Sequence, residues 1–177
     1  MGKLRFVSKI IMGISFATII FVLVYYFFPE QKLAKGRKVD KIVVEKGKRQ
    51  MYVFSNGKKL KTYIVSLGFR PRARKQFEGD GRTPEGKYFI ISKNSKSIAH
   101  KSFGISYPNT ADKRFAARNG KSAGGNIMIH GMMNGREYWG KFHRFIDWTG
   151  GCIALTNSEM DDLFQHVDVG CEVEIVK

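Results

Sequence analysis

Two short stretches near the C-terminal end of the sequence decide how the rest of the chain is interpreted: IMIHG at residues 127–131 and DWTGGCIAL at residues 147–155. The first is an apolar run that ends in His130, and the second places Cys152 between two glycines and another apolar run. A histidine and a cysteine presented in this way are typical of a thiol nucleophile and its general base. The sequence therefore predicts a cysteine-dependent active site carried by short strands.

Cys152 is the predicted nucleophile because the glycines before it allow the backbone to turn sharply. Thr149, Gly150 and Gly151 are expected to position the thiol and to present backbone N–H groups to a developing oxyanion. The alternative is a buried structural cysteine, which has no need of such a close backbone approach.

His130 is the predicted base, because an imidazole at the end of an apolar strand lies at the edge of a sheet and can accept the thiol proton. His143 is closer to Cys152 in the sequence and is a second candidate. These side chains could also bind zinc, but a zinc site usually contains closely spaced Cys-x-x-Cys or His-x-x-x-His pairs, and the sequence has neither. No metal or other cofactor is predicted.

An apolar segment extends from Ile10 to Phe28 without a charged residue. Its 19 residues would form a helix of about 30 Å, enough to cross the hydrocarbon core of a bilayer. Residues 1–9 form a basic tail, and no small-x-small cleavage pattern follows, which favours an uncleaved transmembrane anchor over a signal peptide. More basic residues follow the segment than precede it, and this count alone predicts a cytoplasmic domain.

The 177 residues include 31 lysines and arginines against 15 acidic residues, a net charge of +16. Such an excess is typical of proteins that contact polyanions. The basic residues are scattered over residues 32–75 and 113–141 without a nucleic-acid-binding motif, so lipid headgroups or cell-wall polymers are the preferred partners over nucleic acid. Two cysteines are too few for a disulfide framework, although Cys152 and Cys171 could form one bridge.

Residues 29–40 form a basic linker, after which short β-branched and aromatic runs predict strands. The expected strands are residues 41–45, 50–54, 60–65, 87–91, 103–107, 126–129, 153–155 and 171–176. Asn56-Gly57 predicts a hairpin between the second and third strands, since both residues tolerate positive φ.

One helix is expected after residue 156, because Thr156 and Glu159 match a capping box. The apolar residues that follow at helical spacing are expected to face the sheet, namely Met160, Leu163, Phe164 and Val167. Residues 70–82 and 108–125 are rich in polar residues and glycine and are predicted to be loops.

Together these residues resemble the L,D-transpeptidase catalytic (YkuD-type) domain of bacterial cell-wall enzymes. The resemblance rests on His130-Gly131, on TGGCI at residues 149–153, and on a TPEGKYF turn at residues 83–89. It covers residues 40–177 and implies a mainly β catalytic domain at residues 41–177, with a β-sandwich or barrel-like sheet and one or two short helices.

The resemblance also implies a reaction on peptidoglycan stem peptides. Cys152 would attack the carbonyl of the third residue of a stem tetrapeptide and expel the terminal D-alanine, and an amine would then resolve the thioester into a cross-link or an attached protein. With water as acceptor, the same site would be an L,D-carboxypeptidase or amidase, and a non-catalytic wall-binding module is a further alternative. Since peptidoglycan lies outside the cytoplasmic membrane, a single-pass anchor would place the domain on the periplasmic or cell-wall side, despite the flanking charges.

Two departures from the family pattern lie near the cysteine. The separation of 22 positions between His130 and Cys152 is longer than usual, and Ala154 occupies a position where many members have arginine. Arg144 is a candidate to replace that arginine in binding a substrate carboxylate. The extra length supplies the predicted substrate-binding residues, which are Tyr138, Trp139, His143 and Arg144.

Overall fold

The computed structural model describes residues 2–177, with side chains from Phe6 onward, as two separate units. The first unit ends at Glu30 and consists of α1 (Gly2–Phe27), the one helix among the described residues with the length and composition of a membrane span. This helix takes in residues 2–9, which the sequence assigned to a separate tail, and lysine and arginine are good helix formers. The second unit, Gln31–Lys177, carries all the strands.

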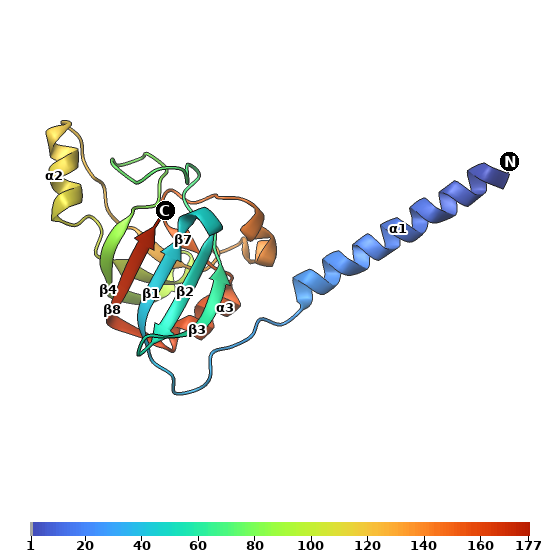
Figure 1. Ribbon diagram of the computed structural model, residues 1–177, viewed down its shortest axis with the longest axis horizontal. Coiled ribbons are helices and arrows are strands. Elements are labelled where there is room, and N and C mark those ends of the chain that lie inside the picture. Colours follow the sequence, from blue (N-terminus) through green and yellow to red (C-terminus); the bar gives the residue numbers. More distant parts are fainter. Residues whose placement is uncertain (1) are drawn as a thin grey trace. The chain divides into compact units, whose positions relative to one another are not determined.

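The strands of the second unit are β1 (Val39–Glu45), β2 (Gln50–Ser55), β3 (Lys58–Ile64), β4 (Gly86–Ser97), β5 (His100–Ile105), β6 (Met128–His130), β7 (Ile153–Ala154) and β8 (Val167–Val176) (Figure 1). Its helices are α2 (Thr110–Arg118), α3 (Asn157–Phe164) and two 3₁₀ segments, η1 (Lys46–Lys48) and η2 (Glu137–Phe145).

All eight strands join one sheet in the order β3-β2-β1-β8-β4-β5-β6-β7. The pairs β1–β8 and β6–β7 are parallel, and the other neighbours are antiparallel. After β3, which forms one edge, the chain reaches the opposite edge, where Ser66 pairs with Ala154 and Gly68 pairs with Thr149. The sheet is therefore a curled half-barrel, and the prediction of a mainly β, barrel-like fold is confirmed.

Each predicted strand is present, although β4 and β8 are longer than expected. The hairpin between β2 and β3 turns at Asn56 and Gly57, which have φ angles of 49° and 74°. Positive φ at both positions is the geometry that the Asn-Gly pair favours, because it matches the twist of the two strands.

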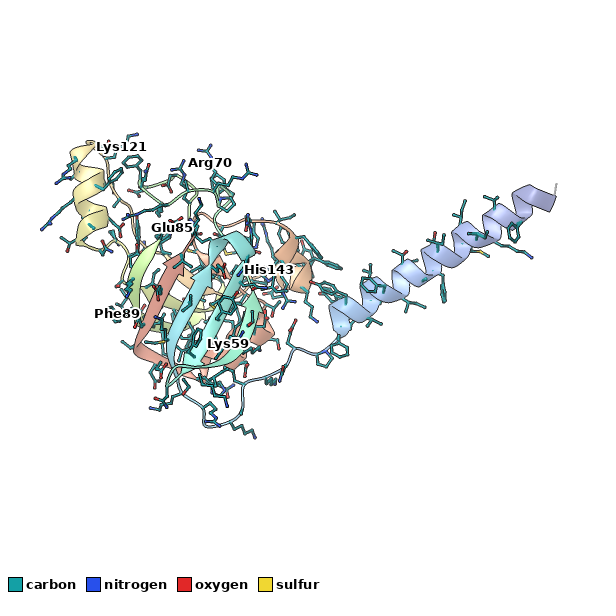
Figure 2. All side chains as sticks on the ribbon, in the orientation of Figure 1. Lys59, Arg70, Glu85, Phe89, Lys121 and His143 are labelled. Carbon is teal, nitrogen blue, oxygen red and sulfur yellow. The ribbon has the colours of Figure 1, made fainter. Side chains whose placement is uncertain are left out.

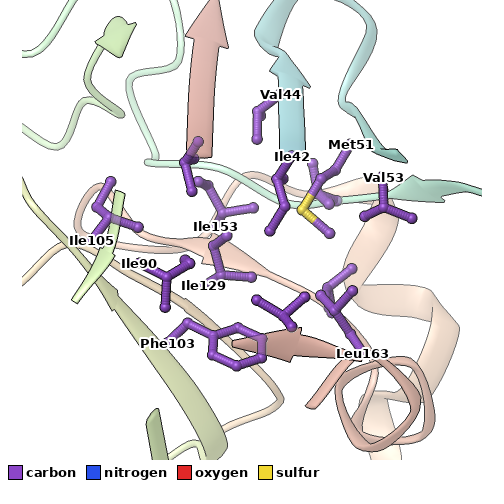
Figure 3. Close-up of a cluster of buried hydrophobic side chains, with 14 of the residues drawn as sticks. Ile42, Val44, Met51, Val53, Ile90, Phe103, Ile105, Ile129, Ile153 and Leu163 are labelled. Carbon is purple, nitrogen blue, oxygen red and sulfur yellow. The ribbon is translucent and has the colours of Figure 1, made fainter. Parts of the chain in front are cut away.

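The hydrophobic core lies inside the curled sheet (Figure 3). Ile129 of β6 and Ile153 of β7 are fully buried and point into this cluster beside Phe103 and Ile90. Each such side chain contributes roughly 1.5–3 kcal/mol by leaving water. From α3, Met160 and Leu163 belong to the core and Phe164 packs against it, as the helical spacing predicted.

Two predictions about local structure are wrong. Residues 108–125 are not only a loop, because α2 forms within them, started by a capping box in which the Asn109 side chain accepts from the Asp112 N–H at 3.0 Å. Val167 belongs to β8 and not to the face of α3. The sequence left open a bridge between Cys152 and Cys171, and in the structure both are free thiols.

Candidate active site

The pairing of β6 with β7 brings His130 and Cys152 onto one face of the sheet. Ile129 lies opposite Ile153, and His130 lies opposite Ala154. Because side chains alternate along a strand and both isoleucines point into the core, His130 and Ala154 point to the other face. Cys152 is two residues before Ala154 and shares its face, diagonally across from His130.

The Cys152 thiol lies between two backbone groups that precede and begin β6. The Met128 N–H donates to Sγ at 3.4 Å, and the thiol donates to the Asn126 carbonyl oxygen at 3.6 Å. Asn126 has a φ of 54°, a left-handed conformation that asparagine tolerates better than most residues. Burial raises the pKa of the Cys152 thiol, and the Met128 N–H and the positive charge of Lys75 partly oppose this rise.

His130 is buried, and the hydrogen bond of its ring defines the tautomer. Nδ1 lies 2.6 Å from the Gly131 carbonyl oxygen, which can only accept, so Nδ1 carries the proton and Nε2 keeps a lone pair. Burial lowers the pKa of His130, while the bond to Gly131 opposes that change. A neutral imidazole with a free Nε2 can accept a thiol proton.

Trp148 was not predicted as a site residue, although it directly precedes the Thr149-Gly150-Gly151-Cys152 motif. Its ring meets the His130 ring edge-on, with centroids 5.8 Å apart, and Trp139 packs against Trp148 at 6.3 Å. The tryptophans therefore support one side of the imidazole, and Trp139 is linked to the site through Trp148.

The turn before Cys152 is stabilised by Thr149 and requires Gly151. The Thr149 hydroxyl accepts from the Gly151 N–H at 3.1 Å and donates to the Cys152 carbonyl at 2.7 Å. Gly151 has a φ of 137°, and a Cβ there would lie 2.6 Å from the Arg82 carbonyl oxygen. At Gly150 a Cβ would meet no atom within 4 Å, so only the second glycine is required sterically.

The hydrogen bonds of Thr149 also determine which backbone N–H groups remain free to bind an oxyanion. The Gly151 N–H is already bonded to Thr149. Among residues 2–177, no atom accepts a hydrogen bond from the backbone N–H of Gly150 or from that of Cys152. Of the predicted set, these two groups are available to a developing oxyanion, and Thr149 and Gly151 have a positioning role.

His143 lies on η2 (Figure 2). It is fully buried and contacts Ser66. The Ser66 hydroxyl donates to the His143 carbonyl at 2.6 Å and lies 2.8 Å from Nδ1, which therefore carries the ring proton. Burial, followed by the charges of Arg144 and His130, lowers the pKa of His143 to about 4. His130 is the better candidate for the general base because it lies on β6, whose Met128 N–H bonds Cys152 Sγ, whereas the His143 ring bonds Ser66.

The remaining substrate-binding candidates have different environments. The Arg144 guanidinium donates to Glu159 at 2.8 Å, and both side chains are buried, at 7% and 2% exposure. This ion pair holds η2 against α3, so Arg144 does not replace the missing arginine at an open surface. Tyr138 is 69% exposed, and Ala154 is fully buried.

The loop at residues 70–82 contains a buried lysine that the sequence did not indicate. Lys75 is 3% exposed and donates to Asp80 and to the Phe77 carbonyl, both at 2.9 Å. Asp80 also accepts from the backbone N–H groups of Gln76, Phe77 and Arg82. The predicted surface loop is thus ordered around an ion pair, and its Arg82 carbonyl packs against Gly151.

Within the described part of the chain, no group of three or more His, Cys, Asp or Glu side chains could hold a metal ion.

Comparison with solved structures gives matches that share this fold. The helical cell shape determining protein Pgp2 from Campylobacter jejuni is 26% identical, with a TM-score of 0.60 over 89% of this chain and 54% of that one. Bd1075 from Bdellovibrio bacteriovorus is 23% identical, with a TM-score of 0.56 over 82% and 52% of the two chains. An L,D-transpeptidase from Stackebrandtia nassauensis is 15% identical, with a TM-score of 0.52 over 85% and 62%.

This chain spans about half the length of the first two proteins. No curated protein matches the sequence. The family model of the L,D-transpeptidase catalytic domain (YkuD) matches residues 40–175. Since this match covers most of the sequence, the chain belongs to the L,D-transpeptidase catalytic domain family.

Proposed function

We propose that this protein is a membrane-anchored peptidoglycan L,D-transpeptidase that uses Cys152 as its nucleophile. The observation that carries the proposal is the placement of Cys152 and His130 on one face of β6 and β7, with His130 Nδ1 bonded to Gly131 and Nε2 left as a base. Family membership supports peptidoglycan as the substrate.

In the proposed reaction, His130 Nε2 takes the thiol proton, and Cys152 Sγ forms a bond to the carbonyl carbon of the third stem residue. The N–H groups of Gly150 and Cys152 stabilise the tetrahedral oxyanion. His130 returns the proton to the leaving amine as the bond to the terminal D-alanine breaks. An acceptor amine then attacks the thioester, transfers its proton to His130 and restores the thiol, leaving a cross-link or an attached protein.

The site also supports a second candidate, hydrolysis on the same scaffold by an L,D-carboxypeptidase or amidase. Ala154 is buried and Arg144 is paired with Glu159, so the arginine that many members place after the cysteine has no replacement at these positions. A site with fewer groups to hold a second stem peptide favours water as the acceptor.

Acylation by a carbapenem tests whether the site is reactive. The full chain in detergent micelles is expected to gain the mass of the drug, and Cys152→Ala is expected to lose that gain. His130→Ala should slow acylation much more than His143→Ala. A chain that is not acylated, or one whose acylation depends on His143 and not on His130, overturns the proposal and leaves a wall-binding module or a different base.

Incubation with purified muropeptides separates transfer from hydrolysis. Dimers linked between third residues support the transpeptidase. Trimmed stems without dimers support the hydrolase.

The proposed location is the cytoplasmic membrane, with α1 as a single span and the catalytic domain on the periplasmic or cell-wall side. Support comes from the length and composition of α1 and from the site of peptidoglycan. The basic residues after α1 favour the opposite orientation, but a folded domain can be translocated despite such charges. A fusion to a reporter that is active only outside the cytoplasm tests the orientation, and activity of a cytoplasmic reporter would refute it.

A further inference from the structure

A groove rich in arginine lies on α2, the helix that the sequence did not predict. One face of this helix presents Ala111, Arg114, Phe115 and Arg118, which recur at i, i+3, i+4 and i+7. Together with Arg74 from the preceding loop they line a cavity of about 310 Å³. Three arginine side chains therefore line a single groove beside an aromatic ring.

The groove is held in shape by a buried carboxylate. Asp112, 2% exposed, accepts from Arg74 at 2.6 Å and from the Tyr88 hydroxyl at 3.0 Å. It also completes the capping box of α2 by accepting from the Asn109 N–H at 3.1 Å. Arg74 and α2 are thus fixed to each other and to β4 before any ligand arrives.

The charge on the groove is largely uncompensated. Asp112 is already bonded to Arg74, Tyr88 and Asn109. Within residues 2–177, neither Arg114 nor Arg118 has an ion-pair or hydrogen-bond partner for its side chain. Guanidinium groups bind carboxylates through paired N–H bonds, so the groove suits a ligand that carries carboxylate groups.

An aromatic side chain, Phe115, lies beside the arginines of the groove. Phe115 is 42% exposed, and its ring stacks on Phe77 at a centroid distance of 5.9 Å. Lys121, which follows α2, lies over the other ring of this pair at 4.6 Å from its centroid (Figure 2). Arginines and an aromatic ring around one hollow fit a peptide that carries carboxylates.

The groove is connected to the candidate active site through two chain segments. Arg74 directly precedes Lys75, whose charge acts on Cys152. After α2, the chain passes Ser122, which accepts from the Glu78 N–H at 2.9 Å, and reaches Asn126, whose carbonyl faces Sγ. Figure 1 shows α2 to the left of β4, with the chain after α2 running back to the sheet.

We propose that the groove formed by Arg74, Arg114, Phe115 and Arg118 binds the carboxylate groups of a peptidoglycan stem peptide next to the one that reaches Cys152. This rests on the proposed function, because peptidoglycan is the substrate that the family implies. The groove retains the polymer through its charges, and the thiol acts on the neighbouring stem.

The test measures binding of the full chain, in detergent micelles and with Cys152→Ala, to purified insoluble peptidoglycan by pelleting. Arg114→Ala with Arg118→Ala is expected to raise the apparent Kd at least tenfold. The matched control, Lys96→Ala with Lys113→Ala, removes the same two charges from exposed positions outside the groove and should change Kd less than twofold. A thermal unfolding curve for each variant verifies folding.

Chemical amidation of the peptidoglycan carboxylates supplies a second arm. Amidation should weaken binding of the chain with intact arginines to the level of the double arginine variant. Binding of the double arginine variant itself should not change on amidation. Equal binding by both chains, or the same loss in the lysine control, overturns the proposal. So does a result in which the arginine variant loses binding to phosphatidylglycerol vesicles but not to peptidoglycan.

This outcome is separable from that of the proposed function, because the binding test uses a chain without the thiol. Loss of binding in the arginine variant together with an unreactive Cys152 in the native chain would support the groove and refute the enzyme. If the native chain is acylated by a carbapenem and the arginine substitutions leave binding unchanged, the enzyme is supported and the groove is refuted.

Discussion

The Thr149 hydroxyl donates to the Cys152 carbonyl oxygen at 2.7 Å and so ties the start of the turn to the residue that carries the thiol. The Thr149 hydroxyl oxygen also accepts a hydrogen bond from the Gly151 N–H at 3.1 Å. Thr149 is 4% exposed, so loss of its hydroxyl would leave buried groups without partners.

Replacing Thr149 by valine keeps the shape of the side chain and removes both bonds. We expect Thr149→Val to lower the free energy of unfolding by about 1–3 kcal/mol. Acylation of Cys152 by a carbapenem should also slow by about tenfold, because the turn is less well fixed. Urea unfolding and mass spectrometry provide the measurements. Thr149→Ser keeps the hydroxyl and should remain close to the native chain; similar losses in both variants would contradict this role.

The two glycines before Cys152 should differ in their tolerance of alanine. Gly151→Ala places a Cβ 2.6 Å from the Arg82 carbonyl at a φ of 137°, and we expect a destabilisation of about 2 kcal/mol or more and loss of acylation. Gly150→Ala meets no atom within 4 Å and should stay within about 0.5 kcal/mol of the native chain. Equal tolerance at both positions, measured by urea unfolding, would show that the turn differs from the one described.

Stability should fall in mild acid because of His143. Its pKa is about 4 in the folded chain and about 6.5 when unfolded, so the unfolded chain alone takes up a proton between these values. The contribution is complete above pH 6.5 and is lost as pH falls towards 4, by at most roughly 3 kcal/mol. His143→Gln removes this titration and should flatten the dependence. Urea unfolding at pH 7, 6, 5 and 4, followed by tryptophan fluorescence, compares the two chains, and parallel curves would exclude the effect.

The buried Lys75 should make the Cys152 thiol easier to ionise. Its positive charge lowers the pKa of Cys152, against the effect of burial. We expect Lys75→Met combined with Asp80→Asn to shift the pH midpoint of iodoacetamide alkylation upwards. The paired substitution avoids leaving a carboxylate without its counter-ion. Lys113→Met removes an exposed charge on α2 and serves as the control, and a shift of the same size there would assign the effect to net charge.

Much of the fold could be predicted from the sequence because most strands are encoded locally. Alternating β-branched and aromatic residues mark each strand, and Asn56-Gly57 marks the hairpin. The helix α2 was missed because its starting signal, Asn109 with Asp112, consists of residues that are equally common in turns. No local pattern encodes the pairing of Ser66 with Ala154, which depends on the curl of the whole sheet.

The candidate site could likewise be predicted only in part from the sequence. Cys152 and His130 lie in short motifs, so both could be selected from the sequence, and their catalytic roles stay predictions. The residues around the thiol could not be predicted from the sequence. Lys75 is buried because it pairs with Asp80, and Arg144 because it pairs with Glu159, and residue spacing does not reveal either pair. Trp148 was the exception, since its position beside the motif was a signal that could have been used.

The segment that carries Cys152 bonds to β6 on one side and to residues 66–69 on the other, and so joins the two edges of the curled sheet. The proposed nucleophile, Cys152, is therefore also part of the contact that closes the fold. Opening this segment to admit a ligand would break bonds on both flanks, so the bonded amides of Thr149 and Ala154 should exchange with solvent only on global unfolding. A bulky substrate or inhibitor must then be accommodated without opening the segment to which it becomes attached.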